Sequence, residues 1–199
     1  MMVLPNARFR TQRKYQANNV AYDNSTVLEG AATTSTNITV GAGATIIVFA
    51  AGNVTTAARV DGVAMTLVGK TANAAMYYAT GLAAGVRNVQ VDRSGSTSYI
   101  VSVLSYTGVS VVSGGVLGSG SGTTQSGSPS GTGGLAVVGF DIGLSSSDVG
   151  LVTSNGAIRV LYRRTSGNAL VVADKPVPPV EIANPTGGSY TTIAVWLTT

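Results

Sequence analysis

The sequence predicts an all-β protein, an antiparallel two-sheet β-sandwich, or a barrel, that follows an extended N-terminal arm. Short apolar runs alternate with turn residues along the chain, and 26 of the 199 residues are glycine. The apolar residues are mostly Ala and Val, with only three Phe and one Trp, a mixture that favours thin, twisted strands over helices. A chain of this length is expected to form one sandwich domain, which we place at residues 25–199.

Twelve runs have the length and alternation of strands, and their spacing is typical of sandwiches and barrels. They cover residues 36–40, 44–51, 58–60, 63–68, 74–79, 86–91, 99–106, 135–142, 149–153, 157–164, 169–173 and 191–198. In the last run Ile193, Val195 and Leu197 share one face, while Ala194 and Trp196 lie on the other. Because both faces are apolar, this run is expected to be central in its sheet or covered by a partner.

Three turns can be predicted from their residues. Asp61-Gly62 and Asn155-Gly156 each lie between alternating runs and supply the positive φ angles that a two-residue hairpin requires. The Ser-Gly-Asn triplet at residues 166–168 is expected to form a three-residue hairpin loop.

Two segments interrupt the strand pattern. Residues 113–134 are rich in Gly and Ser and are expected to form a flexible loop. Residues 175–180 contain three prolines. They are expected to form an extended polyproline strip, because proline lacks the amide donor that a sheet ladder needs.

The basic residues are concentrated at the N-terminus. Residues 1–24 hold four of the twelve basic residues and one of the eight acidic residues. A polar segment of this kind buries too little apolar surface to become ordered alone, so it predicts an extended arm held by a neighbouring subunit. The residues expected to dock on that partner are Arg8, Phe9, Arg10, Arg13, Lys14 and Tyr15. Cations with aromatics also suit nucleic acid, but four cations are a small footprint, and we favour an acidic protein surface.

The composition excludes several kinds of chemistry. The chain has no Cys and no His, which removes disulfides, thiolate chemistry, and the commonest general base and metal ligand. It also has no Gly-x-Ser-x-Gly, Walker or Gly-x-Gly-x-x-Gly pattern, the patterns of esterase and nucleotide sites. We therefore expect no enzymatic activity, no cofactor and no metal.

The acidic residues are scattered singly, mostly beside turns, where Asp bonds to nearby backbone. A glycosidase needs two facing carboxylates. The candidates are Asp61, Asp92, Asp141, Asp148, Asp174, Glu29 and Glu181. Asp141 and Asp148 bracket a loop and could share a calcium ion, but no ligand-spaced acidic motif supplies the other oxygens.

Aromatic and basic residues on the predicted strands offer another kind of site. Five tyrosines could form a sugar-stacking platform, although alternating aromatics more often fill a sandwich core. These tyrosines are Tyr77, Tyr78, Tyr99, Tyr106 and Tyr162. Arg159 and Arg163 share one strand face, with Arg164 opposite, and all three are expected in solvent or at the rim of an interface.

Charged residues make up only 10% of the chain, against about 25% in typical soluble domains. A surface so poor in charge is expected to contact neighbouring subunits, and a trimer-like homo-oligomer is favoured. The first eight residues lack the apolar core of a secretory signal, and the longest apolar runs are too short to span a bilayer. Neither export by that route nor a membrane location is expected.

Several local patterns follow one another in order over residues 36–199. They are residues 37–43, 60–68, 76–78, 81–85, 103–109, 171–176 and 193–197. In this order they resemble a family of β-sandwich modules found in actinobacterial phage virions and related bacterial surface proteins. The resemblance implies a jelly-roll-like sandwich that serves as a structural or adhesive module without catalytic residues. Family members carry modules in tandem, whereas this chain is expected to have one module behind its arm.

These observations together predict a non-enzymatic structural protein of a bacteriophage virion, assembled in the host cytoplasm. The single module behind a basic arm favours a capsid decoration protein that docks on the major capsid protein or another virion subunit. The alternative is a tail-associated or surface adhesion module that binds host carbohydrate.

Overall fold

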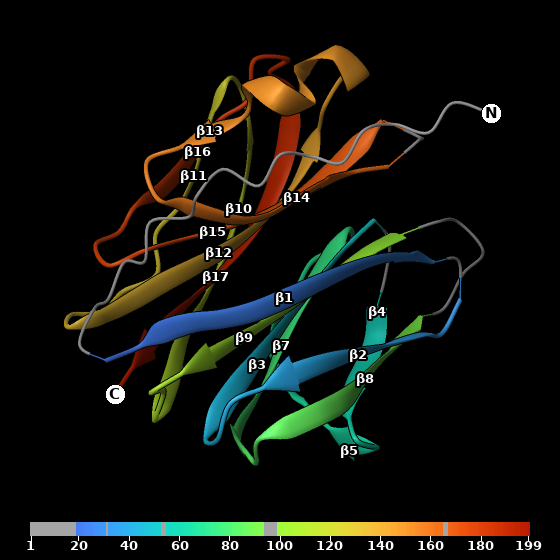
Figure 1. Ribbon diagram of the computed structural model, residues 1–199. Coiled ribbons are helices and arrows are strands. Elements are labelled where there is room, and N and C mark those ends of the chain that lie inside the picture. Colours follow the sequence, from blue (N-terminus) through green and yellow to red (C-terminus); the bar gives the residue numbers. More distant parts are fainter. Residues whose placement is uncertain (1–18, 31, 53–54, 94–98, 165–166) are drawn as a thin grey trace.

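The computed structural model describes residues 19–30, 32–52, 55–93, 99–164 and 167–199. In these ranges the chain forms seventeen strands and one short 3-10 helix, η1 (Ser146–Leu151). The strands pair antiparallel, so the predicted all-β class is confirmed. They form four sheets where a two-sheet sandwich was predicted (Figure 1).

The first half of the chain forms a five-stranded and a four-stranded sheet. Their strand orders are β1-β9-β3-β7-β6 and β2-β8-β4-β5. The bounds are β1 (Ala21–Gly30), β2 (Thr34–Val40), β3 (Ala44–Ala51), β4 (Thr55–Val60), β5 (Val63–Ala64), β6 (Thr66–Lys70), β7 (Ala74–Leu82), β8 (Gly85–Arg93) and β9 (Tyr99–Thr107). Alternate residues of the two sheets meet in one core that includes Ile46, Val48, Val89 and Tyr99.

The second half forms a five-stranded and a three-stranded sheet. Their strand orders are β10-β17-β12-β15-β14 and β11-β16-β13. The bounds are β10 (Val111–Ser121), β11 (Thr124–Gly127), β12 (Gly134–Gly143), β13 (Thr153–Ser154), β14 (Ala157–Arg163), β15 (Asn168–Lys175), β16 (Val180–Ala183) and β17 (Ser189–Thr198). Phe140, Val171, Ile182 and Trp196 contribute to the core between these sheets.

The two halves share one topology. In each long sheet the first strand of the half pairs with its last strand, which pairs with its third. The short sheets, β2-β8-β4 and β11-β16-β13, correspond in the same way. The described residues thus hold two sandwiches of like strand order where a single module was predicted. The jelly-roll designation stays a prediction.

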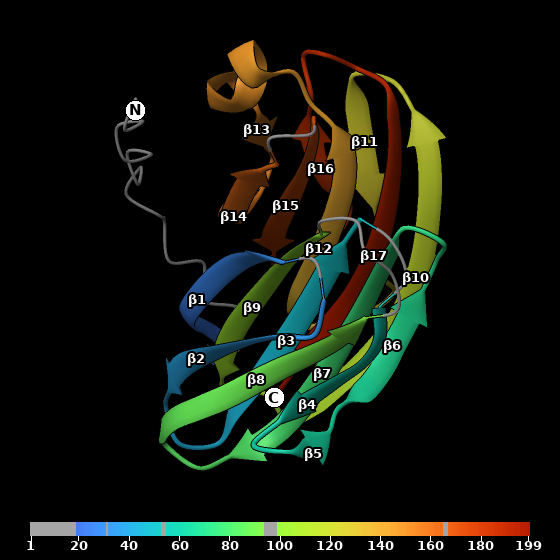
Figure 2. The same ribbon diagram turned by 90° about the vertical axis from the view of Figure 1, so that its right-hand side faces the viewer.

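The two long sheets pack face to face, so the molecule has four layers of sheet (Figure 2). A third core lies between the halves and contains residues of both, including Phe49, Leu104, Val137 and Val195. We call this contact zone the seam. At its centre a Cβ on Gly139 would collide with the ring of Phe49, so the close approach of the sheets depends on glycine there.

The predicted flexible loop at 113–134 is wrong. Residues 111–121 form β10 and residues 124–127 form β11, which pair with β17 and β16. The glycines allow close packing, because a Cβ at Gly118, Gly127 or Gly131 would collide with Thr192, Val138 or Trp196. The glycines of this segment therefore permit close packing against neighbouring side chains. Pairing with β17 and β16 gives the segment a regular strand structure.

Of the predicted turns, the one at Asp61-Gly62 is confirmed and the one at Asn155-Gly156 is wrong. Asp61-Gly62 is confirmed as the hairpin turn between β4 and β5, with φ of 49° and 80°. The loop predicted at 166–168 lies between the antiparallel strands β14 and β15, and Gly167 there has a φ of 105°. Residue 166 lies outside the described residues, so the turn type stays a prediction. The Asn155-Gly156 hairpin is wrong, because β13 pairs with β16 while β14 pairs with β15.

Other boundaries also change. The arm boundary drawn after residue 24 falls inside β1, which begins at Ala21 because its residues pair with β9. The strand predicted at 149–153 is wrong, since most of it belongs to η1. The last predicted run is confirmed as a central strand: β17 lies between β10 and β12. Ile193 packs in the seam, and Trp196 packs in the core of the second half.

Candidate functional site

The predicted docking arm lies outside the described residues, so Arg8, Phe9, Arg10, Arg13, Lys14 and Tyr15 stay a prediction. The point where the arm joins the body can be described. Val20 is fully buried in the seam, and the carbonyl of Asn19 lies against Gly108 in the connection between the halves. A test of the arm must therefore leave residues from 19 onward intact.

The candidate carboxylates have separate partners. Asp61 and Asp92 pair with Arg87 and Arg59, and a hydrogen bond from Arg87 lowers the pKa of Asp61. Glu29 and Glu181 accept hydrogen bonds from Tyr162 and Asn155, and Asp148 accepts one from Thr186. In the described part of the chain, no three acidic residues gather where they could hold a metal ion.

The five tyrosines do not form an exposed platform. Tyr77 and Tyr99 are buried in the core of the first half, and Tyr106 is buried in the seam. Tyr78 and Tyr162 are half-buried against the seam core. Their rings fill the interior, as alternating aromatics on strands usually do.

Two of the three strand arginines are buried, which corrects the prediction that all three lie in solvent or at a rim. Arg159 and Arg164 are 4% and 7% exposed, whereas Arg163 is half-buried. The physical reason is the seam. β14 is an edge strand whose sheet faces the first half of the chain. Arg159 and Arg164 are therefore covered by protein, whereas in a single sandwich they would be exposed to solvent.

Arg159 takes part in a buried polar cluster that joins the two halves. Its Nε donates to Asp174 Oδ2 at 2.6 Å, and Tyr106 Oη donates to the same oxygen at 3.0 Å. The guanidinium also lies 4.4 Å from the centre of the Tyr22 ring. Tyr22 and Tyr106 belong to the first half, and Arg159 and Asp174 to the second. We call these four residues the seam cluster.

Burial is the largest influence on the pKa values of Asp174 and Tyr106 in the seam cluster. Burial raises the pKa of Asp174, and hydrogen bonds from Arg159 and Tyr106 oppose the rise. Burial also raises the pKa of Tyr106 well above its ordinary value, so its hydroxyl keeps the proton that it donates. These contacts hold the two halves of the chain together. One sequence signal pointed to it: period two places Asp174 on the same buried face as Leu170 and Val172.

A second buried carboxylate lies on the seam face of β12. Asp141 is 6% exposed and shares a strand face with Val137 by period two. Burial raises its pKa to about 6, and the charge of Arg164 and a hydrogen bond from Asn168 oppose the rise. The guanidinium of Arg164 packs on Gly52, where a Cβ would collide with it.

Asp141 is expected to make stability depend on pH. Its pKa is higher in the folded than in the unfolded protein, so the folded state binds more protons and stability falls as pH rises. Between pH 4 and 7 the loss should be about 2 kcal/mol. Asp141→Asn should flatten this slope, as urea unfolding at several pH values can measure. An unchanged slope in the variant would contradict the assignment.

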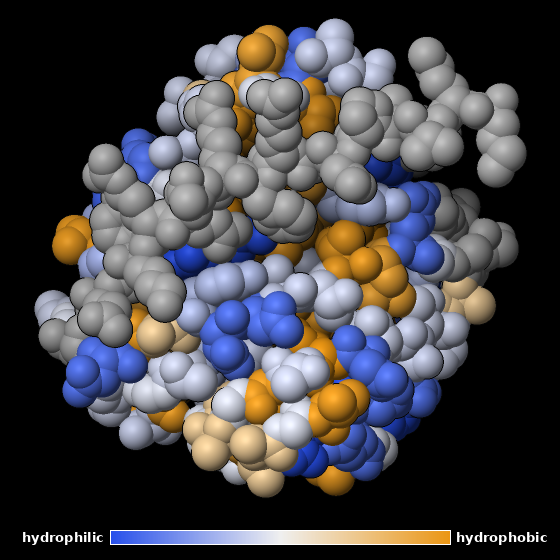
Figure 3. Space-filling view, viewed as in Figure 1, coloured by the Kyte–Doolittle hydropathy of each residue, from blue (hydrophilic) through white to orange (hydrophobic). Residues whose placement is uncertain are grey.

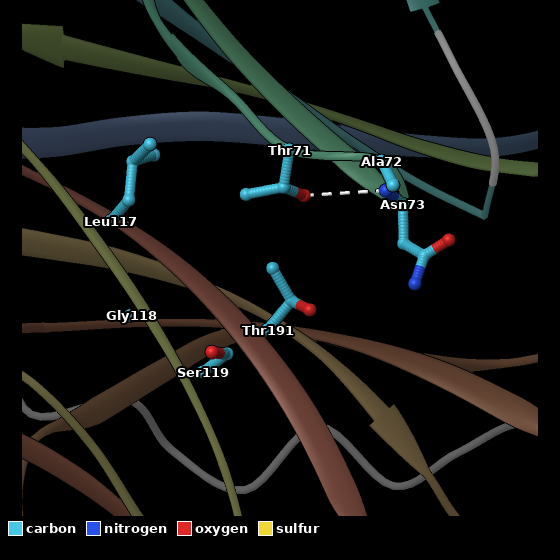
Figure 4. Close-up of a pocket in the computed structure, with 7 residues that line it drawn as sticks. All are labelled: Thr71, Ala72, Asn73, Leu117, Gly118, Ser119 and Thr191. Carbon is cyan, nitrogen blue, oxygen red and sulfur yellow. Dashed lines mark hydrogen bonds between the residues drawn. The ribbon is translucent and has the colours of Figure 1, made fainter.

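A shallow groove of about 240 Å³ crosses the seam at the edge where β6 and β10 meet (Figure 4). It is lined by Thr71, Ala72, Asn73, Leu117, Gly118, Ser119 and Thr191. Thr71 Oγ1 already accepts from the amides of Asn73 and Ala74. The lining has no titratable group, so the groove offers contact and hydrogen bonding but no acid–base chemistry.

The surface has little charge to offer a ligand. Much of the face in Figure 3 is pale, with hydrophilic and hydrophobic residues in small patches. Within the described residues, Asp92, Asp61 and Asp174 form ion pairs with Arg59, Arg87 and Arg159. In the ranges that the structure describes, no helix has the length and hydropathy to cross a bilayer.

The described residues thus assemble buried polar contacts that join the two halves of the chain. Comparisons of this chain with protein-family models, with curated proteins and with solved structures give no match.

Proposed function

We propose that this chain is a non-enzymatic structural protein of a bacteriophage virion, a capsid decoration or accessory protein. In this proposal residues 1–18 dock on the major capsid protein or another virion subunit, and the double sandwich lies outside the shell. Many identical copies, each bound weakly, together stabilise the particle by avidity. The arm becomes ordered when it binds.

The observation that carries the proposal is the contrast between arm and body. The arm has four cations within seven residues, whereas most arginines of the body are paired with aspartates or buried. Arg59, Arg87 and Arg159 are paired with aspartates, and Arg93 and Arg164 are buried. Attraction to an acidic surface is therefore concentrated in the arm, and the neutral body suits close packing among identical neighbours.

The proposal predicts that the arm cations are needed for particle binding. A full-length variant with Arg8, Arg10, Arg13 and Lys14 changed to alanine should lose at least about ten-fold in affinity for shells, because it loses its charge-assisted contacts. The body should keep its thermal midpoint, since β1 begins only at Ala21. Co-sedimentation with particles that lack the protein, and immunogold images of complete particles, measure these effects.

The matched control is Lys70→Ala with Lys175→Ala, which removes cations from the body and should leave binding unchanged. Retention of the arm variant at wild-type occupancy would overturn arm docking. Absence of the chain from purified particles would overturn the virion role.

A further inference from the structure

Strand β10 lies at one end of its five-stranded sheet (Figure 2). Among the strands that the structure describes, it pairs with β17 on one side and with no strand on the other. In an antiparallel sheet every second residue of an edge strand directs its N–H and C=O away from the neighbouring strand. Most residues of β10 are exposed, and Val116 and Leu117 expose 38% and 48% of their surface.

This edge lacks two of the usual protections against strand pairing, charged residues and proline. Monomeric β proteins place charged residues, proline or bulges on exposed edges. β10 has no charged residue and no proline, and the whole segment from residue 94 to 140 is free of charge. The other edges of the long sheets, β1, β6 and β14, each contain charged residues. A bulge interrupts β10 between Gly114 and Val116, which leaves residues 116–121 in regular register.

A second copy of the chain fits this edge. A two-fold axis places β10 of one copy antiparallel to β10 of the second copy. A charged residue near the axis would then face the same charge in the second copy. An axis at Ser119 sets Ser119 opposite itself and Gly118 opposite Gly120 of the second copy. Leu117 then lies opposite Ser121. No like charges or large side chains oppose each other in this register.

We propose that two copies of this chain pair through residues 117–121 of β10, antiparallel about a two-fold axis at Ser119. The two five-stranded sheets then form one ten-stranded sheet. This two-fold pair differs from the trimer-like cluster that the composition favours. It does not rest on the virion role, because the pairing is a property of the free chain.

Charge substitution at Ser119 tests the pair. The full-length chain should have a mass of about twice 20.0 kDa by light scattering or native mass spectrometry at micromolar concentration. Ser119→Glu and Ser119→Lys should each raise the dimer dissociation constant about ten-fold or more, because like charges face each other across the axis. An equal mixture of the two variants should restore the double mass.

The matched controls are Ser35→Glu and Ser35→Lys, which place the same charges on an exposed serine of the edge strand β2. They should leave the mass unchanged. A wild-type mass of one or three chains would overturn the proposal. So would a dimer that survives both Ser119 substitutions, or a mixture that stays monomeric.

Discussion

Replacing Gly139 with alanine is expected to lower the free energy of unfolding by about 1–3 kcal/mol. The new Cβ would collide with the ring of Phe49, which belongs to the opposite long sheet and is fully buried. Either the ring leaves its position or the two sheets separate locally, and both outcomes loosen the seam. Urea unfolding measured on the full chain gives the difference directly.

Gly143 provides the matched control at the end of the same strand. A Cβ there would meet no atom within 4 Å, and Gly143 does not have a positive φ. Gly143→Ala should therefore change stability by about 0.5 kcal/mol or less. If Gly139→Ala has an equally small effect, the two halves do not depend on close approach at this point.

Replacing Arg159 with methionine is expected to cost about 3–5 kcal/mol. The change leaves the fully buried carboxylate of Asp174 with one hydrogen-bond donor, Tyr106, where it had two. It also removes the cation from the ring of Tyr22. Because the seam cluster joins residues of both halves, the loss should appear as cooperative destabilisation of the whole chain in urea.

The partly exposed pair Arg59–Asp92 offers the comparison. Arg59→Met should cost about 1 kcal/mol or less, since its side chain is 38% exposed. The double variant Arg159→Met with Asp174→Leu should be more stable than Arg159→Met alone, because no buried charge is left unpaired. Equal stabilities of these two variants would show that the charge of Asp174 is not the source of the loss.

The pH response of Arg159→Met should follow the sign for a buried acid. Burial already raises the pKa of Asp174, and without the guanidinium the rise becomes larger. The folded variant then binds a proton that the unfolded chain releases, so its deficit should grow as pH increases from 4 to 8.

Prediction from the sequence succeeded where the signal is local. Asp61-Gly62 is a hairpin turn because both residues tolerate positive φ, and β17 is central because both of its faces are apolar. Prediction failed where the signal depends on distant neighbours. Residues 113–134 look like a flexible loop by composition, yet β10 and β11 in this segment pair with β17 and β16. Arg159 likewise looks exposed, but residues of the first half cover it.

By itself the sequence determined that this chain makes strands and where several of them begin and end. Only the tertiary structure shows that the strands form two sandwiches of the same strand order, whose long sheets pack against each other at the seam. The reason is physical. Each strand's own sequence shows which side chains alternate between its two faces. Which sheet covers each face depends on contacts between residues about ninety positions apart, such as Phe49 and Gly139.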